Sequence, residues 1–408
     1  MKEICAHEEC TGCTACSNAC SKSAINFKQD RLGFLYPEIN QENCINCGLC
    51  RKTCPNNGSV FKNIPIETLV GYATDVEEQK TSSSGGIASA ISRWIIKNNG
   101  IVYGCSAESI DNICHIRVDK EQDLIKLKGS KYVQSDMRNC YSLVRKDVIN
   151  GKIVLFVGTP CQVAGLKLFL RKEYSNLITI DFVCHGVPSQ TILKASLNSQ
   201  DLSLKNNNYN ISFRRKIRKG NDYVSSYGLF VKDQKDHKNN SEYIYEGYYP
   251  KDMYITGFLS ALFYRESCYQ CHYTTPERVS DITVGDYSDN EGAYRNMKGK
   301  DLLLSMIAIN TLKGKDILNK LDGKITTAQI DYDKLLEAQG QLRKPMHLHP
   351  NRIEFENNFG KQDFNTLVRH LLQSDLKRIK KIERSRKIRH IIYSIPYLKY
   401  LLQIVRNK

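Results

Sequence analysis

The 408-residue chain has no cysteine beyond Cys271, a single tryptophan, and no apolar run of the ~20 residues that a membrane-spanning helix needs. Its start, MKEICAHEEC, has no basic segment followed by an apolar one, so we expect no secretory signal. A cytoplasmic protein is therefore expected, whose reducing surroundings disfavour a disulfide framework. A hydrophobic content of 41% with 25% charged residues excludes wholesale disorder.

Acidic residues are scarce near the C-terminal end, and this accounts for most of the net charge of +16. Residues 1–60 have six basic and six acidic side chains, whereas residues 369–408 have twelve basic and two acidic ones. An apolar stretch, 391–405, follows the densest basic part. Such a tail either docks its apolar side on the body or lies against an anionic surface, namely the inner face of the membrane or an acidic partner. No nucleic acid is expected as a partner, because no nucleic-acid-binding module accompanies the charge.

Cysteine, by contrast, is abundant: there are sixteen, and nine of them lie in the first 54 residues. Eight of these nine form two runs with the spacing Cys-x2-Cys-x2-Cys-x3-Cys. Three thiolates two residues apart can surround one face of an iron–sulfur cube, while the fourth cysteine of each run ligates the other cluster. The runs therefore predict two 4Fe-4S clusters, one held by Cys10, Cys13, Cys16 and Cys54 and the other by Cys44, Cys47, Cys50 and Cys20.

This segment resembles a bacterial-ferredoxin-type domain, in which two clusters conduct electrons and do not catalyse. Ser21 stands where proline usually follows the first run, but this change removes no ligand. Zinc is the rival metal, yet structural zinc sites use two CxxC-type pairs and not runs of four. Cys5 lies outside the pattern and is predicted to be an ordinary thiol. The chemistry itself must then lie further along the chain.

The remainder of the chain predicts an α/β arrangement. Continuous apolar runs at 153–157 and 177–183 indicate strands buried on both faces of a parallel sheet. The carboxyl ends of such strands meet at one edge, where ligands bind. We also expect helices at 87–97, 136–149 and 163–172, and strands at 70–74, 101–105, 113–118, 211–215, 224–231, 282–284 and 302–310.

The predicted class is α+β, with three parts. A small ferredoxin-like domain comes first, an α/β domain with a mixed, largely parallel sheet comes second, and a helical basic tail comes last. We place these parts at residues 1–62, 63–345 and 346–408.

Four later cysteines are candidates for a further metal site. Cys161 and Cys184 lie at the ends of the two buried strands, and Cys268 and Cys271 form a CxxC pair. A helix N-terminus lowers the pKa of a thiol, so we expect Cys161 to favour the thiolate. Four thiolates suffice for one more cube, although structural zinc or unrelated thiols fit the same spacing.

Five motifs stand in one order along the chain: TSSSGG at 81–86, VGTPCQVAGL at 157–166, VCHGVPS at 183–189, CxxCHY at 268–273 and SDITVGDY at 280–287. Together they resemble the coenzyme F420 hydrogenase/dehydrogenase beta-subunit family, to which chlorophyll-pathway 7-hydroxymethyl reductases also belong. The resemblance covers about residues 65–345. It implies a flavoprotein carrying FAD, with a third 4Fe-4S cluster held by Cys161, Cys184, Cys268 and Cys271.

The flavin site is less sharply indicated. Small residues at the start of helix 87–97 offer backbone N–H groups and hydroxyls to a diphosphate, but a plain helix cap would look the same. The segment 129–132 matches a family segment near the flavin, or is a surface loop. A histidine beside Cys184 could donate to a cluster sulfide or to the flavin, or be structural, and a polar turn after strand 282–284 could line the flavin. The candidate residues are Ser83, Ser84, Gly85, Gly86, Gly129, Ser130, Lys131, Tyr132, His185, Gly285 and Asp286.

These features combine into an iron–sulfur flavoprotein oxidoreductase. Clusters transfer single electrons, an organic hydride acceptor takes two, and a flavin can hold one or two. Electrons would pass between ferredoxin, or another one-electron carrier, and a small-molecule substrate or coenzyme such as F420. A reductase of another small molecule fits equally well, and no catalytic residue is identified. The alternatives are a non-catalytic electron-transfer subunit of a larger complex and a scaffold with vestigial metal sites, which the full set of twelve cysteine ligands disfavours.

Overall fold

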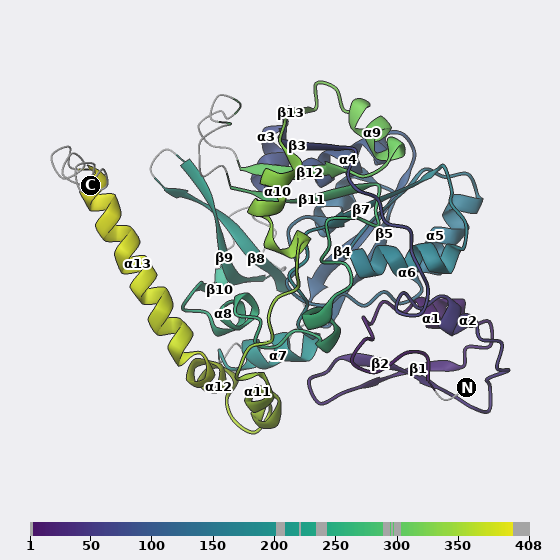
Figure 1. Cartoon of the computed structure of the whole chain (residues 1–408), viewed down its shortest axis with the longest axis horizontal. Helices are drawn as coiled ribbons and strands as arrows, with labels where there is room; N and C mark the ends of the chain where they lie inside the picture. The colour runs from purple at the N-terminus through teal and green to yellow at the C-terminus, as the bar shows by residue number, and fades with distance from the viewer. Residues whose placement is uncertain are drawn as a thin grey trace.

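The computed structural model of the chain describes residues 3–200, 209–219, 222–233, 243–288, 294, 297 and 303–394. Figure 1 shows a small N-terminal module at one corner of a larger body built around a central sheet, and a long helix along the opposite side. These parts confirm the predicted class: a ferredoxin-like start, an α/β body with a mixed sheet, and a helical C-terminal segment.

The N-terminal module consists of one antiparallel hairpin and two short helices. The hairpin pairs β1 (Ile25–Gln29) with β2 (Leu35–Ile39), and α1 (Ala15–Ala19) and α2 (Leu49–Lys52) lie beside it. Each helix begins directly after a left-handed residue, Thr14 or Gly48, and both lie inside the cysteine runs. In each run, the left-handed residue turns the backbone, and a short helix begins directly after this turn.

The body is built on an eight-stranded mixed sheet with the strand order β13-β3-β12-β11-β7-β6-β4-β5. The four strands β11, β7, β6 and β4 pair in parallel, and the pairs on either side of them are antiparallel. The strands are β3 (Glu67–Ala73), β4 (Ile101–Ser109), β5 (Asn112–Val118), β6 (Val154–Gly158), β7 (Leu177–Phe182), β11 (Ile282–Tyr287), β12 (Leu304–Ile309) and β13 (Ile325–Gln329).

Both faces of this sheet are covered by helices, as the continuous apolar runs predicted. On β6, Val154 and Phe156 pack with α5 and α6, whereas Leu155 between them packs with α4 and α9 on the other face. The helices of the body are α3 (Val76–Thr81), α4 (Ile87–Lys97), α5 (Cys140–Ile149), α6 (Pro160–Leu170), α9 (Leu312–Asn319) and α10 (Tyr332–Ala338), with the 3-10 helix η1 (Glu121–Leu127). The helix predicted at 87–97 is confirmed to the residue.

Several predicted element boundaries were wrong, and three of them have a local reason. The helix expected from residue 136 begins at Cys140, because Asp136 bridges to Cys114 and Arg138 takes a left-handed φ of 46°. The helix expected from residue 163 begins at Pro160, after a capping box between Thr159 and Gln162. The strand expected to end at residue 284 continues to Tyr287, as its pairing with β12 shows.

A smaller antiparallel sheet and a group of helices complete the body. The sheet has the order β10-β9-β8, formed by β8 (Tyr209–Lys219), β9 (Asp222–Asp233) and β10 (Tyr243–Tyr248). Its hairpin is longer than the two short strands predicted at 211–215 and 224–231. The helices are α7 (Gln190–Asn198), α8 (Met253–Leu259), η2 (Glu266–Gln270), η3 (Gly340–Leu342), α11 (Arg352–Asn358), α12 (Phe364–Leu371) and α13 (Gln373–Ser394).

The basic C-terminal segment divides at α12. Leu367, Val368 and Leu371 on α12 are buried against the body, whereas α13 runs away from it in Figure 1. Within the described ranges, no helix is long and apolar enough to cross a membrane. Most of the apolar stretch 391–405, for which docking on the body and contact with an anionic surface were the alternatives, lies outside the described residues.

Candidate functional site

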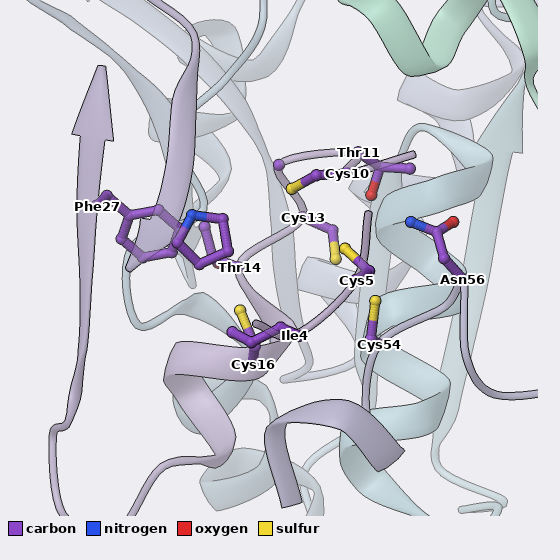
Figure 2. Close-up of a pocket in the computed structure, with 12 residues that line it drawn as sticks. Ile4, Cys5, Cys10, Thr11, Cys13, Thr14, Cys16, Phe27, Cys54 and Asn56 are labelled. Atoms are coloured by element: carbon purple, nitrogen blue, oxygen red, sulfur yellow. The ribbon is translucent and has the colours of Figure 1, made fainter. Parts of the chain in front are cut away.

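The first predicted cluster site is a small cavity in the N-terminal module. Figure 2 shows the sulfurs of Cys10, Cys13, Cys16 and Cys54 arranged around it. All four residues are buried, and burial raises the pKa of Cys13 to about 12. A thiol in such surroundings loses its proton when a metal replaces it. Four thiols around one enclosed space are the donor set that a 4Fe-4S cube takes, so the residues fit the predicted group.

Cys5 lines the same cavity, although its position in the sequence suggested an unrelated thiol. Hydrogen bonds with Cys10 and Cys54 raise the pKa of Cys5 far above its usual range and lower the pKa of Cys10 to about 6. Cys5 is thus a close neighbour of two of the predicted ligands, Cys10 and Cys54. The spacing could not show this, because the contact depends on how the first residues fold back.

The second predicted quartet lies further out. Cys47 is exposed, and Cys20, Cys44 and Cys50 are half-buried. Burial raises the pKa of Cys50, with Cys20 and Cys44 close enough to add a like-charge contribution. Of the two N-terminal quartets, the one containing Cys20 and Cys47 is therefore the more accessible from solvent.

The first quartet faces the body across α6. A Cβ atom on Gly165 would lie 3.0 Å from Cys13 Sγ and 3.1 Å from the Tyr141 hydroxyl, so this glycine allows a close approach. Gly165 stands one helical turn after Cys161 on α6. Cys13, Cys161 and Cys271 also pack against one hydrophobic cluster. The structure thus places the first quartet next to the four later cysteines.

The four later cysteines come together from three parts of the chain. Cys161 lies in the first turn of α6, Cys184 follows β7, Cys268 lies in η2 and Cys271 ends it. Burial is the main cause that raises the pKa of each thiol. For Cys161, Cys184 and Cys268, repulsion from other members of the quartet adds to this rise. The expected lowering of the Cys161 pKa was wrong, because burial outweighs the helix N-terminus.

Four thiols from three parts of the chain are a donor set that either a 4Fe-4S cube or a single zinc ion uses. Among the described residues, no three His, Cys, Asp or Glu side chains are placed to hold one metal ion. In a 4Fe-4S cube each cysteine binds a different iron, so its four ligands lie further apart than the ligands of one zinc.

A buried ion pair anchors the CxxC segment to the sheet. Arg278 and Asp181 are both almost fully buried, and the Arg278 Nη2 atom lies 3.0 Å from Asp181 Oδ1. Arg278 also donates to the carbonyl of Tyr273 at 2.8 Å and to the hydroxyl of Thr283 at 3.2 Å. The pair therefore ties the segment after Cys271 to the carboxyl end of β7.

The predicted flavin residues of two separate loops contact each other. Ser130 donates its backbone N–H to Ser83 Oγ at 2.8 Å, and its hydroxyl lies 3.0 Å from the same atom. The Ser84 hydroxyl lies 2.8 Å from the Ser305 hydroxyl, which also accepts from the Gly85 N–H. Gly86 has a φ of 85° and begins α4. Loops 81–86 and 129–132 thus form one wall.

The remaining residues of segment 129–132 have different surroundings. The Lys131 ammonium donates to the carbonyls of Leu127 and Lys128, and burial lowers its pKa to about 8. The Tyr132 ring stacks on Phe258 with centroids 4.6 Å apart. Gly129 has a φ of 81°, and a Cβ there would meet no atom within 4 Å. Among the described hydrogen bonds, Ser130 is the residue of this segment that bonds to loop 81–86, through its backbone N–H and its hydroxyl.

The predicted polar turn at Gly285 and Asp286 is instead the end of β11. Register with β12 places Asp286 opposite Ser305, beside loop 81–86. Asp286 forms an ion pair of 2.5 Å with Arg214 of β8, and lies within electrostatic range of the exposed His185. The carboxylate therefore faces the same region as the loops.

Sequence reasoning missed the contribution of β8 and β9. Arg214 lies over the Tyr227 ring at 4.9 Å, and Tyr227 stacks near Tyr132. The Lys216 ammonium donates to the carbonyls of Gln79 and Ser84. These residues belong to a hairpin that had no motif, so the sequence held no signal for them.

Two family models match this chain. Residues 151–333 match the family described as the C terminus of the beta subunit of coenzyme F420 hydrogenase/dehydrogenase, and residues 9–57 match the 4Fe-4S dicluster domain. The chain carries that family's C-terminal domain behind a dicluster domain. These matches confirm the resemblance that the motifs indicated. They also confirm the N-terminal 4Fe-4S dicluster domain that the cysteine runs predicted.

Two individual proteins are similar to this beta-subunit-like chain. It is 23% identical over 356 residues to the coenzyme F420-dependent sulfite reductase of Methanocaldococcus jannaschii, which covers 83% of this chain and 50% of the relative. The chain thus spans half the length of that curated relative. A chain of the F420-reducing [NiFe] hydrogenase complex from Methanosarcina barkeri aligns with a TM-score of 0.45 at 16% identity, covering 78% of this chain and 92% of that one.

Proposed function

We propose that the protein is an iron–sulfur flavoprotein oxidoreductase that passes electrons between ferredoxin-type 4Fe-4S clusters and, via FAD, a two-electron organic substrate or coenzyme such as F420. One observation carries the proposal: the buried quartet with Cys13 and the later quartet with Cys161 are neighbours across Gly165. The quartet with Cys47 is the more accessible one, and Tyr132 of segment 129–132 lies within electrostatic range of Tyr264, as do Cys184 and Cys268.

The cysteines supply the ligands for the clusters. The two N-terminal quartets would hold the dicluster pair, and Cys161, Cys184, Cys268 and Cys271 would hold the third cube. The Asp181–Arg278 pair fixes the CxxC segment relative to β7. Gly165 permits the close approach of Cys13 to α6. The chain's own residues thereby keep the first and third quartets adjacent.

The flavin would lie against the wall formed by loops 81–86 and 129–132. When bound, FAD supplies a group that holds one or two electrons and so joins one-electron clusters to a two-electron substrate. Lys216 and the start of α4 offer positive charge to its diphosphate. Tyr132 and Tyr227 offer aromatic surface. This set fits a flavin nucleotide, and the sequence-predicted flavin residues remain proposals within it.

The proposal is tested by electron transfer in the full chain. Anaerobically reconstituted protein is mixed with reduced ferredoxin, and flavin absorbance is followed before a screen of oxidants that includes F420. Bleaching of the flavin followed by reoxidation with one oxidant is the expected result. Reduced clusters with no flavin response would contradict the proposal.

The affinity for flavin should fall as pH rises. Burial, and next to it the charge of Arg214, lowers the pKa of Lys216 to about 8. The ammonium that attracts a diphosphate is present below this pH and is lost above it, so flavin should bind several-fold more weakly at pH 9 than at pH 7. Equilibrium binding of FAD to deflavinated protein measures this change. A Lys216→Gln variant should bind weakly at both values, and a steep pH dependence in that variant would contradict the assignment.

A second candidate is a non-catalytic electron-transfer subunit of a larger reductase. It is favoured by the coverage of the sulfite reductase relative, half of which has no counterpart in this chain. The exposed basic residues of α13 up to residue 385 would then offer a contact to an acidic partner or to an anionic membrane surface. Cosedimentation with anionic vesicles tests these two contacts. Binding to vesicles that is lost when α13 is deleted indicates a membrane contact, and no binding to vesicles indicates a protein contact.

A further inference from the structure

Arg265 is a fully buried arginine between the two parts of the molecule. Its guanidinium donates to the carbonyl of Cys10 at 2.5 Å, to the carbonyl of Leu35 at 3.0 Å and to Gln134 Oε1 at 3.2 Å. In the described part of the chain no carboxylate pairs with it, in contrast to the buried Arg278 and Arg352. A buried cation without a counter-charge is strongly unfavourable, so a negative charge is needed nearby.

The first cluster site supplies that charge. The Arg265 Nη2 atom lies 3.4 Å from Cys10 Sγ, within hydrogen-bonding distance of a sulfur ligand. A cube with four thiolates is negatively charged, and more so after it accepts an electron. Hydrogen bonds to ligand sulfurs and the net charge around a cluster set its reduction potential. The guanidinium therefore stabilises the reduced form of the first cluster more than the oxidised form.

The surrounding residues are shaped to hold the guanidinium in this place. It lies over the Tyr36 ring at 4.2 Å. A Cβ atom on Gly12, whose φ is +66°, would lie 2.9 Å from Arg265 Nη1 and 2.6 Å from Gln134 Nε2. Gly12 stands between Cys10 and Cys13, so the backbone between these two cysteines packs directly on the Arg265 guanidinium.

The same residue is linked to the third quartet through its backbone. Arg265 donates its N–H to the carbonyl of Val187, and its carbonyl accepts from the N–H of Cys268 at 2.9 Å. Cys184 and Cys268 lie within three residues of these contacts. Arg265 therefore contacts a ligand of the first cluster with its side chain and a ligand of the third with its backbone.

We propose that Arg265 is a positioning residue that raises the reduction potential of the first cluster relative to the second, so that electrons entering at the accessible quartet move inward. The inference rests on the proposed function for its ligand sets. The second quartet has no contact with Arg265 among the described hydrogen bonds. The effect should therefore be confined to one cluster of the pair.

An EPR-monitored redox titration of the full, anaerobically reconstituted chain tests this. In Arg265→Met the potential of one cluster should shift to more negative values, while the other clusters and the iron content stay as in wild type. Arg265→Lys should shift less, because it keeps the charge. Arg352→Met is the matched control: it also removes a buried guanidinium, but one that donates to Leu262 and pairs with Glu356, and no potential should change.

The outcomes separate this inference from the function it rests on. Unchanged potentials in an iron-replete Arg265→Met protein would overturn the role of Arg265 and leave the proposed function intact. A wild-type chain that takes up no iron would contradict the proposed function itself. If Arg265→Met does not keep its iron, Arg265→Gln, which retains amide donors without the charge, must show the same shift, and its absence would equally overturn the role.

Discussion

Replacing Cys161 with serine should lower the iron content of the reconstituted chain from about twelve to about eight atoms and abolish electron transfer to the flavin. The reason is that Cys161 lies in the first turn of α6 and contributes one of the four thiols of the third quartet. The dicluster pair should remain, because none of its predicted ligands changes. Iron analysis, together with reduction of the clusters and the flavin by ferredoxin, measures both effects.

Cys105→Ser provides the matched control. This half-buried thiol lies in β4, outside all three quartets, so its replacement should leave iron content and electron transfer unchanged. An iron content near twelve in Cys161→Ser would show that the third quartet holds no cluster. An equal loss in both variants would point to damage to the fold in place of a lost ligand.

Replacing Asp181 with asparagine should reduce the free energy of unfolding by roughly 3–5 kcal/mol. The carboxylate is fully buried beside Arg278, and its removal leaves a buried guanidinium without a counter-charge. Denaturant unfolding of the full chain, with midpoint and slope measured together, tests the size of the effect.

Two further variants make this prediction specific. Glu38→Gln breaks an exposed ion pair with Lys28, both more than half exposed, and should cost no more than about 1 kcal/mol. Asp181→Leu combined with Arg278→Met removes both buried charges and should recover much of the loss. If Asp181→Asn were as mild as Glu38→Gln, the pair would not anchor the CxxC segment as described.

Spacing and period were enough to predict much of this molecule from the sequence. The doubled cysteine run identified the dicluster domain, because ligand spacing is a local property of the chain. Continuous apolar runs placed β6 and β7, and the apolar stripe from Ile87 placed α4 to the residue. The order of five motifs then indicated the family.

Burial and side-chain contacts between segments that are distant in the sequence could not be predicted from spacing and periodicity. The pKa of Cys161 was expected to be lowered by the helix N-terminus, but the depth of burial, which the sequence does not show, raises it. Arg214 and Lys216 stand more than 60 residues from their functional neighbours, Asp286 and Ser84. Likewise, the burial of Arg265 against Cys10 follows from the docking of the N-terminal module.

The central claim is that three clusters and a flavin lie along one route, and its most direct test is the cofactor content of the full chain. Protein reconstituted under anaerobic conditions is analysed for iron, sulfide and flavin per chain. The proposed function predicts about twelve iron atoms and one flavin. About eight iron atoms with no flavin would contradict the account, because the dicluster domain would then be the sole redox centre.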